Sequence, residues 1–384
     1  MILQLLLLGD APVAQMVERA RLAETNGYDT VWVADERFHR EVYSSLGQLA
    51  AHTSRVLLGP CVTDPFARHP ALTAMAIATL DEISGERAIL GIGAGISGFA
   101  ELAIERRKPA TAMREAIEVI RALLRGETVD HHGEVIAFNH GRLNFSPPRP
   151  GIPVYVASNG PLGQGVAAEL ADGVIMEGCG SAAEVRAVRT AVEGDARNAG
   201  RDPRAIQIIA RLNTCIAADG HAARDAVRPT VARYLGAGRL RSRTAAAQGL
   251  TLPADAVATV AGAAYASGVT PYMPLLPLIT DRHVDAFTLA GTADEVVGTR
   301  DRTAQRRGRR GHRAALCRRG RGDRGDDRHA RFRGLAPSYV RDCAGFDFLG
   351  LSPAVRAWYP ARLAGAPPDG VRSDDHARSG GEFK

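Results

Sequence analysis

Up to about residue 215, the chain alternates short apolar runs with amphipathic stretches of helical period. The apolar runs are residues 2–8, 30–34, 55–62, 88–93, 153–157, 173–177 and 206–217. The first helical stretch keeps apolar side chains at Val13, Val17 and Ala20 and stops at Gly27, so it has one face suited to packing. Continuous apolar strands that alternate with helices indicate a parallel sheet covered by helices on both faces.

The number of these units favours a barrel over an open sheet. A doubly wound sheet commonly has five or six strands, whereas a (β/α)8 barrel has eight. Seven units and one not accounted for therefore predict an α/β protein with the fold of a (β/α)8 TIM barrel. Residues 129–150 interrupt the pattern with His131, His132 and a Pro147-Pro148 pair, and we expect them to lie outside the barrel.

The stretch from residue 220 to 297 is expected to contain further helices and the start of the last unit. It is Ala-rich and includes the segment VTPYMPLLPLITD. Its end, LAGTADEVV, places Thr292 before Ala293, Asp294 and Glu295. A threonine followed by acidic residues is typical of a capped helix N-terminus.

The residues after 297 follow a different pattern. Gly298 to Lys384 contain 19 Arg and 1 Lys against 10 acidic residues, a net charge of +10, whereas residues 1–297 carry a net charge of −4. No period of 2 or 3.6 is present. A basic tail that contacts RNA is one interpretation, and translation of GC-rich DNA out of frame is the one we favour. We therefore predict a barrel domain at 1–297 and an Arg-rich tail at 298–384, with the last β/α unit missing or scrambled.

Charge and composition indicate which kinds of binding partner and which cellular compartment to expect. Because the basic excess lies in the tail, the body offers no cationic surface for nucleic acid. The start, MILQLLLL, lacks the basic residues of a signal peptide, and no later stretch is long enough to span a membrane. The five cysteines have neither C-x-x-C nor zinc spacing. We expect a cytoplasmic protein, a homodimer, with no metal, no membrane and no nucleic-acid partner.

Polar or glycine-rich loops follow five of the predicted strands. They read ADERFHRE, CVTDPFARH, GIGAGISG, ASNGPLGQG and EGCGS. Turn residues would explain each loop by itself, but in a barrel all five meet at one end. Their coincidence predicts a ligand-binding mouth there.

The stretch GAGISG, residues 93–98, matches the G-x-G-x-x-G pattern of dinucleotide-binding proteins. That fold also needs an acidic residue about 20 positions later at the end of a strand. Here Glu115 and Glu118 fall inside a helix, at positions that we expect to be on its surface. A dinucleotide-binding fold is therefore not expected.

The remaining motifs do not assign a phosphate site, a metal site or a hydrolase site. Backbone amides of Gly160 and Gly163 at a helix N-terminus suit a phosphate, but Ser158 or Asn159 would equally cap an ordinary turn. The His131-His132 pair has no third ligand nearby and is interpreted as a solvated loop. The G-x-S-x-G elbow of a serine hydrolase is absent from the sequence.

Several long runs resemble the bacterial luciferase-like superfamily of flavin and deazaflavin oxidoreductases. Within it they are most similar to methylenetetrahydromethanopterin reductases. The matching stretches are LAETNGYDTVWVAD, LLGPCVTDPFARHPALTAMAIATLDEISGERAILGIGAG, VASNGPLGQGVAAELADGV and LAGTADEVV. They span roughly residues 10–297, and the second is long and specific.

The resemblance implies a (β/α)8 barrel with insertions and a cis peptide bond between Cys61 and Val62, in a bulge of the third strand behind the cofactor ring. The Gly59-Pro60 pair would bend the strand at this place. The cofactor implied is the deazaflavin coenzyme F-420, with FMN as the alternative. The implied cofactor-binding residues are Asp35, Cys61, Val62, Thr63, Gly93, Gly95, Ser158, Asn159, Gly160, Pro161, Glu177 and Gly178.

Two departures concern the acid–base groups. The reductases carry Glu in the first strand where this chain has Leu6, and His after the second-strand Asp where it has Glu36. Asp35 and Glu36 are the catalytic candidates, since either could relay a proton. The predicted function is hydride transfer between deazaflavin and an organic substrate, resembling methylenetetrahydromethanopterin reductase; the alternatives are an FMN-dependent luciferase-like monooxygenase and a non-catalytic flavin-binding relative.

Overall fold

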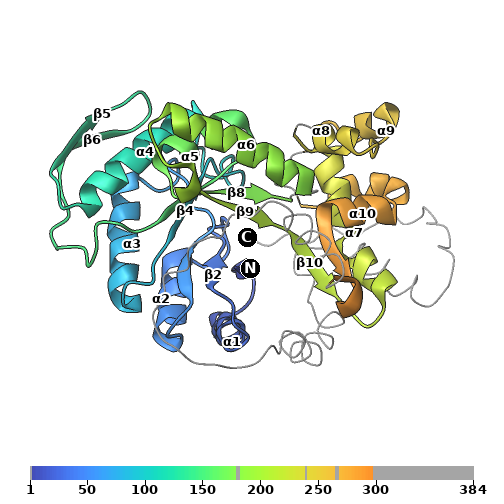
Figure 1. Cartoon of the computed structure of the whole chain (residues 1–384), viewed down its shortest axis with the longest axis horizontal. Coiled ribbons are helices and arrows are strands. Elements are labelled where there is room, and N and C mark those ends of the chain that lie inside the picture. The colour runs from blue at the N-terminus through green and yellow to red at the C-terminus, as the bar shows by residue number, and fades with distance from the viewer. Residues whose placement is uncertain (1, 179–181, 238–239, 264–267, 297–384) are drawn as a thin grey trace, which may run out of the picture. The chain divides into compact units, whose positions relative to one another are not determined.

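The computed structural model describes residues 2–178, 182–237, 240–263 and 268–296 (Figure 1). Every described residue belongs to the first of the two compact units into which the chain divides, Met1–Phe346. Cys179, the last part of the EGCGS loop, and the tail predicted at 298–384 lie outside the described residues.

Seven parallel strands form the wall of the barrel. The first sheet contains β1 (Gln4–Leu7), β2 (Thr30–Val33) and β3 (Leu57–Pro60), and the second contains β4 (Leu90–Gly93), β7 (Val154–Ala157), β8 (Gly173–Glu177) and β9 (Gln207–Arg211). Two isolated parallel bridges, Leu58 to Ala88 and Thr63 to Ile92, join β3 to β4. Each strand lies within one of the predicted apolar runs. Among the described strands, β1 and β9 are each paired on one side only.

Six helices alternate with these strands. They are α1 (Val13–Thr25), α2 (Val42–His52), α3 (Pro70–Ser84), α4 (Pro109–Leu124), α5 (Pro161–Leu170) and α6 (Ala182–Asn198). Figure 1 shows them side by side around the strands. Their apolar faces pack on outward-facing strand residues such as Val31, Val33 and Leu58, all fully buried. Gly85, in the left-handed conformation at φ 67°, ends α3 as a glycine C-cap does.

The segment after α4 is a hairpin outside the barrel, as predicted. Strands β5 (Val129–His132) and β6 (Ala137–Gly141) pair antiparallel. The interpretation of His131-His132 as a loop was wrong, because both residues belong to β5. The exposed His132 ring lies 3.4 Å from Asp130.

The expectation that Glu115 lies on the surface was also wrong. Glu115 is only 6% exposed, and its carboxylate accepts hydrogen bonds from the backbone N–H groups of Glu134, Val135 and Ile136 at 2.7, 3.0 and 2.8 Å. The hairpin folds back over α4 and needs an acceptor for these amides. Glu118 is exposed, as expected.

The part of the chain after β9 adds a smaller sheet and several helices. Strand β10 (Asn213–Ile216) pairs in parallel with β11 (Thr288–Gly291). Between them lie a 3-10 helix (Thr270–Leu278) and four helices, α7 (Gly220–Gly236), α8 (Leu240–Ala247), α9 (Ala254–Ala258) and α10 (Asp281–Phe287). The predicted cap at Thr292 is confirmed, since its hydroxyl accepts from Glu295 N and the Glu295 carboxylate accepts from Thr292 N.

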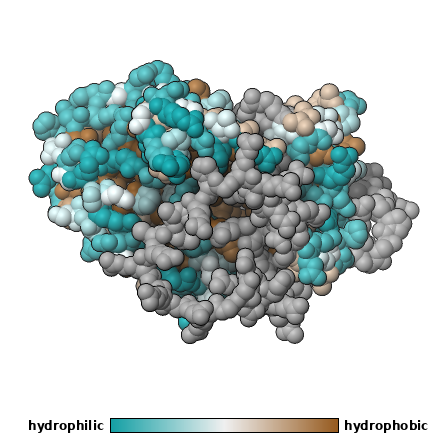
Figure 2. Space-filling view, viewed as in Figure 1, coloured by the Kyte–Doolittle hydropathy of each residue, from teal (hydrophilic) through white to brown (hydrophobic). Residues whose placement is uncertain are grey.

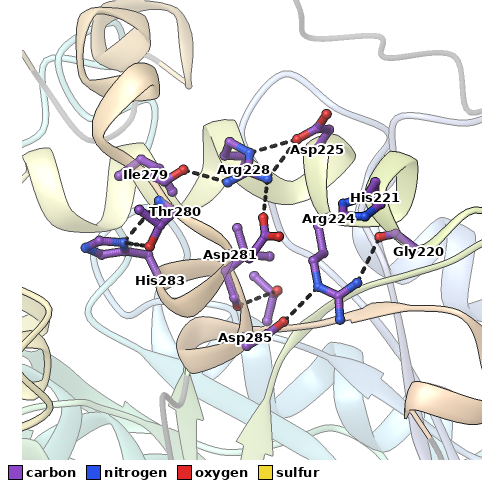
Figure 3. A network of polar contacts seen from close by, with 12 residues as sticks. Gly220, His221, Arg224, Asp225, Arg228, Ile279, Thr280, Asp281, His283 and Asp285 are labelled. Carbon is purple, nitrogen blue, oxygen red and sulfur yellow. Dashed lines mark hydrogen bonds and ion pairs between the residues drawn. The ribbon is translucent and has the colours of Figure 1, made fainter. Parts of the chain in front are cut away.

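Two arginines of α7 connect this part of the chain (Figure 3). The Arg228 guanidinium lies 2.8 Å from Asp225 and 2.6 Å from Asp281, and also donates to the Ile279 carbonyl. Arg224, one turn earlier, pairs with Asp285 at 3.1 Å and with Glu295 at 3.4 Å. Ion pairs thus connect α7 to α10 and to the turn after β11.

Within the described ranges, no helix combines the length and the apolar character needed to cross a bilayer.

Candidate functional site

The inside of the barrel is lined by apolar side chains. Trp32, Ile89, Tyr155 and Ile175 form a buried inner cluster. The partly exposed side chains packed against it are Leu6, Leu57, Cys61, Val62, Ala157 and Ile209. Leu6 contributes an apolar side chain from β1, so this layer has no carboxylate from that strand. We call these six residues the floor of the site.

The chain after β3 takes the expected course. The Cys61–Val62 peptide bond is cis, as the resemblance implied. Cys61 N donates to Val33 O at 2.7 Å, Thr63 N donates to Gly91 O at 3.0 Å, and Gly93 N donates to Thr63 O at 2.9 Å. The irregular segment is therefore held by β2 on one side and by β4 on the other.

Glycines let these strands approach one another closely. A Cβ atom on Gly93 would lie 2.7 Å from Cγ2 of Val62, well inside ordinary contact distance. Gly95 has a φ of 62°, and a Cβ there would lie 2.7 Å from the Phe99 ring. Side chains at both positions would displace the floor or the loop after β4.

The environment of Cys61 keeps its thiol protonated. Burial raises its pKa to about 11, attraction to Arg211 opposes the rise, and repulsion from Glu177 adds to it. An uncharged thiol is a weak nucleophile, so Cys61 acts as an apolar side chain of the floor and not as a reactive group.

Asp35, at the end of β2, lies in a network of charged groups. The Arg37 guanidinium is 3.7 Å from the Asp35 carboxylate, donates to the Asp35 carbonyl at 2.9 Å, and forms an ion pair with Asp64. Asp64 is 1% exposed and also accepts from Phe66 N and Ala67 N, each at 2.9 Å. The loops after β2 and β3 are thereby fixed together. Glu36 is half-buried in the first of these loops.

The loop after β4 covers this network through Phe99. The Phe99 ring has the Arg37 guanidinium at 5.5 Å from its centroid and the Arg106 guanidinium at 5.2 Å. Arg106 also donates to the Gly95 carbonyl. Three successive βα loops therefore meet around one buried aromatic ring.

The loop after β7 leads into the N-terminus of α5, with Pro161 as its first residue. The Ser158 hydroxyl accepts from Gly160 N at 3.1 Å, and Asn159 Oδ1 accepts from Glu177 N at 3.0 Å. The turn-capping interpretation of Ser158 is thus confirmed, while a phosphate at this terminus stays a prediction. Asn159 ties the loop to the end of β8.

Glu177 and Gly178 end β8 beside β9. Glu177 pairs with Arg211 at 3.2 Å, and Gly178 N donates to Arg211 O at 2.9 Å. Both charged side chains are about 30% exposed. This ion pair gives the mouth a polar side with no net charge.

Sequence reasoning missed three residues of this region, Asp64, Phe99 and Arg211. The Asp64-Pro65-Phe66 stretch is a signal for an Asx turn, which places a carboxylate against its own backbone. The partners of Phe99 and Arg211 come from distant loops, and no local pattern in the chain announces such contacts.

Unpartnered polar atoms test whether a cofactor fits here. Among the described residues, the buried hydroxyl oxygens of Tyr43 and Thr63 have no hydrogen-bond partner. Buried polar atoms are normally paired, so a ligand with polar edges fits this end of the barrel. An apolar floor with a nearby unpaired hydroxyl suits the flat ring of a flavin or deazaflavin.

Comparison with known families agrees with this geometry. The family described as luciferase-like monooxygenase matches residues 4–311. The chain is 37% identical to a 5,10-methylenetetrahydromethanopterin reductase of Archaeoglobus fulgidus over 281 residues, which is 72% of this chain and 82% of the relative. A second such reductase, from Methanolobus tindarius, is 34% identical over 74% of this chain and 85% of its own length.

A solved structure shows the same fold. The coenzyme F-420-dependent tetrahydromethanopterin reductase of Methanopyrus kandleri superposes with a TM-score of 0.70 and 27% identity. The match covers 79% of this chain and 90% of that one. The predicted luciferase-like TIM-barrel fold is confirmed.

Proposed function

The chain belongs to the luciferase-like monooxygenase family, and from this premise we propose that it is an oxidoreductase that transfers a hydride between the deazaflavin coenzyme F-420 and an organic substrate. Two relatives that it matches over more than 70% of its length are named as reductases of methylenetetrahydromethanopterin, and a matching solved structure is F-420-dependent. When bound, the deazaflavin would supply the hydride chemistry. The protein's own residues would bind and orient the two reactants.

The single observation that carries the proposal is the composition of the floor. Six side chains without charge (Leu6, Leu57, Cys61, Val62, Ala157 and Ile209) line the inside of the barrel. Such a surface accepts one face of a planar ring and excludes water from it. Thr63 and Asp35 would meet its polar edge, Gly93 and Gly95 would lie under the side chain of the cofactor, and residues 158–161 would meet its phosphate.

Asp35 and Glu36 would handle protons at the edge of the ring. Asp35 is held by Arg37, so we assign it the fixed position and Glu36 the more mobile one. Glu177 and Gly178 would border the substrate side of the same mouth.

Cofactor binding tests the proposal directly. Purified protein should bind oxidised deazaflavin more tightly than FMN, and bound deazaflavin should protect Cys61 from alkylation at pH 9–10, followed by peptide mass spectrometry. Gly93→Ala should weaken deazaflavin binding by at least about tenfold, because the new Cβ displaces Val62. Gly151→Ala is the matched control, since a Cβ there meets nothing within 4 Å.

Two results would favour the alternatives. Tight FMN binding with oxygen consumption would indicate a monooxygenase. Bound deazaflavin with no hydride transfer to any acceptor would indicate a non-catalytic relative, for which the replacement of an acid by Leu6 is the supporting observation.

We also propose that the protein is a homodimer. The outward face of α3 exposes Leu72, Met75 and Ile83, each about half exposed, whereas the visible outer surface in Figure 2 is largely hydrophilic. A second copy of the same face would cover this stripe. Sedimentation should show a dimer, and Met75→Glu should shift the protein to monomer.

A cytoplasmic location is part of the same proposal. Cys61 is a free thiol, which suits a reducing compartment.

A further inference from the structure

We propose that the substrate of this site is an uncharged, largely apolar molecule with a single polar oxygen, rather than a phosphorylated or carboxylated one. This inference rests on the proposed function and concerns only the space above the floor. It comes from the charges and the exposed side chains of the loops that follow the strands.

Six of the seven arginine and lysine side chains of these loops already have partners in the protein, and Arg107 is the exposed exception. Arg37 pairs with Asp64, and Arg40 donates to the carbonyls of Asp10 and Gly9 at 2.7 and 3.3 Å. Arg106 donates to Gly95 O and stacks on Phe99, and Arg211 pairs with Glu177. An anionic substrate would have to compete with each of these acceptors.

The loops also carry no cationic excess. Across residues 8–12, 34–41, 61–69, 94–108, 158–160, 177–178 and 211–212 there are eight acidic and seven basic side chains. A site that selects phosphate or carboxylate normally concentrates arginine or lysine around the anion. Because acidic and basic side chains are nearly equal in number in these loops, the loops do not attract an anionic substrate.

The same loops expose large apolar side chains. Of the eleven large hydrophobic side chains that are exposed among the described residues, five belong to these loops: Leu8, Phe38, Ile96, Leu102 and Leu212. We call these five the apolar rim. The other six are Ile2, Phe145 and Leu162, together with the α3 stripe of Leu72, Met75 and Ile83.

Three members of the apolar rim, Phe38, Leu102 and Leu8, are connected through their loops. A Cβ on Gly98 would lie 3.3 Å from the Phe38 ring, and Leu102 N donates to Gly98 O. On the other side of Phe38, the His39 ring contacts the Leu8 carbonyl at 2.9 Å. The loops after β1, β2 and β4 therefore present neighbouring apolar side chains, and Phe38 is 70% exposed. Exposure of this kind, concentrated at one end of a barrel, is a feature of ligand-binding surfaces.

The Glu177–Arg211 pair is where the polar group of the substrate would bind. It offers N–H and carboxylate groups without net charge, and it adjoins Cys61 of the floor. A carbonyl or hydroxyl oxygen could hydrogen-bond there while the remaining carbon skeleton contacts the apolar rim.

Two probes distinguish the substrate classes by binding alone. Protein loaded with oxidised deazaflavin is titrated calorimetrically with carvone, an uncharged cyclic enone, and with glucose 6-phosphate. We expect carvone to bind with a Kd that changes less than about twofold between 50 and 500 mM NaCl, because no ion pair is screened. Glucose 6-phosphate should not bind.

Variants locate the binding to the apolar rim. Phe38→Asp and Leu212→Asp should each weaken carvone binding at least about fivefold, while Ile2→Asp, at an exposed position before the start of β1, should leave it unchanged. Salt-sensitive binding of glucose 6-phosphate, failure of carvone to bind to loaded protein, or equal effects of all three variants would overturn the inference. Failure of the protein to load with deazaflavin would instead overturn the proposed function.

Discussion

At the scale of single residues, Glu115 shows how a buried carboxylate can serve the backbone. Burial raises its pKa, but the N–H groups of Ile136, Glu134 and Val135 lower it by more, so the net shift is downward. A group with a lowered pKa in the folded state stabilises the fold above the ordinary carboxyl range and loses this contribution as the pH falls through its folded pKa.

We predict that Glu115→Ala lowers the free energy of unfolding by about 2–3 kcal/mol at pH 7, since three buried amides lose their acceptor. Urea denaturation measures the loss, and hydrogen exchange should show faster exchange at residues 134–136. The exposed Glu118→Ala on the same helix should change stability by less than about 0.5 kcal/mol. Equal losses for the two variants would contradict the assignment.

A second residue-scale prediction concerns Cys61. Because burial raises its pKa to about 11, iodoacetamide should label it slowly at pH 7 and about tenfold faster for each pH unit up to that value. Labelling that is already fast and independent of pH from 7 to 9 would show that the thiol does not lie in the apolar floor.

At the scale of elements, the strands could be predicted because apolar runs and glycine-ended helices are local signals. All seven barrel strands, the cap at Thr292 and the position of the hairpin outside the barrel followed from them. Contacts between distant loops did not, because the partners of Arg37 and Phe99 are set only when β2, β3 and β4 pair. The surface assignment of Glu115 failed for the same reason, since its acceptor role depends on a hairpin about 20 residues away.

The contact between α7 and α10 gives the element-scale prediction. Hydrogen bonding to Arg228 lowers the pKa of Asp281, so this contribution is present at neutral pH and disappears as the pH falls through the lowered value. Arg228→Met should cost about 1–2 kcal/mol at pH 7 and much less at pH 3. Hydrogen exchange at residues 279–287 reports the change. Arg204→Met, which removes an exposed pair with Asp202, should have no effect at either pH.

At the scale of the whole molecule, closure of the barrel requires a strand beyond the seven described. Among the described strands, β1 and β9 each have one neighbour, and a sheet edge that stays unpaired favours aggregation. The out-of-frame interpretation of residues 298–384 predicts that resequencing the gene around codon 297 will reveal one inserted or deleted base. The corrected frame should encode an apolar strand and a helix. An unchanged DNA sequence would contradict this interpretation and favour a true basic tail.

The two arginines of α7 also affect the order in which the protein assembles during synthesis. Arg224 leaves the ribosome 71 residues before its partner Glu295, an interval of roughly 4–14 s at ordinary elongation speed. During that interval the N-terminal strands can already associate, whereas the acceptors of Arg224 and Arg228 that lie in α10 and after β11 have not yet been made. A ribosome stalled between codons 240 and 280 should therefore carry a nascent chain with a protease-resistant N-terminal part and a still cleavable α7.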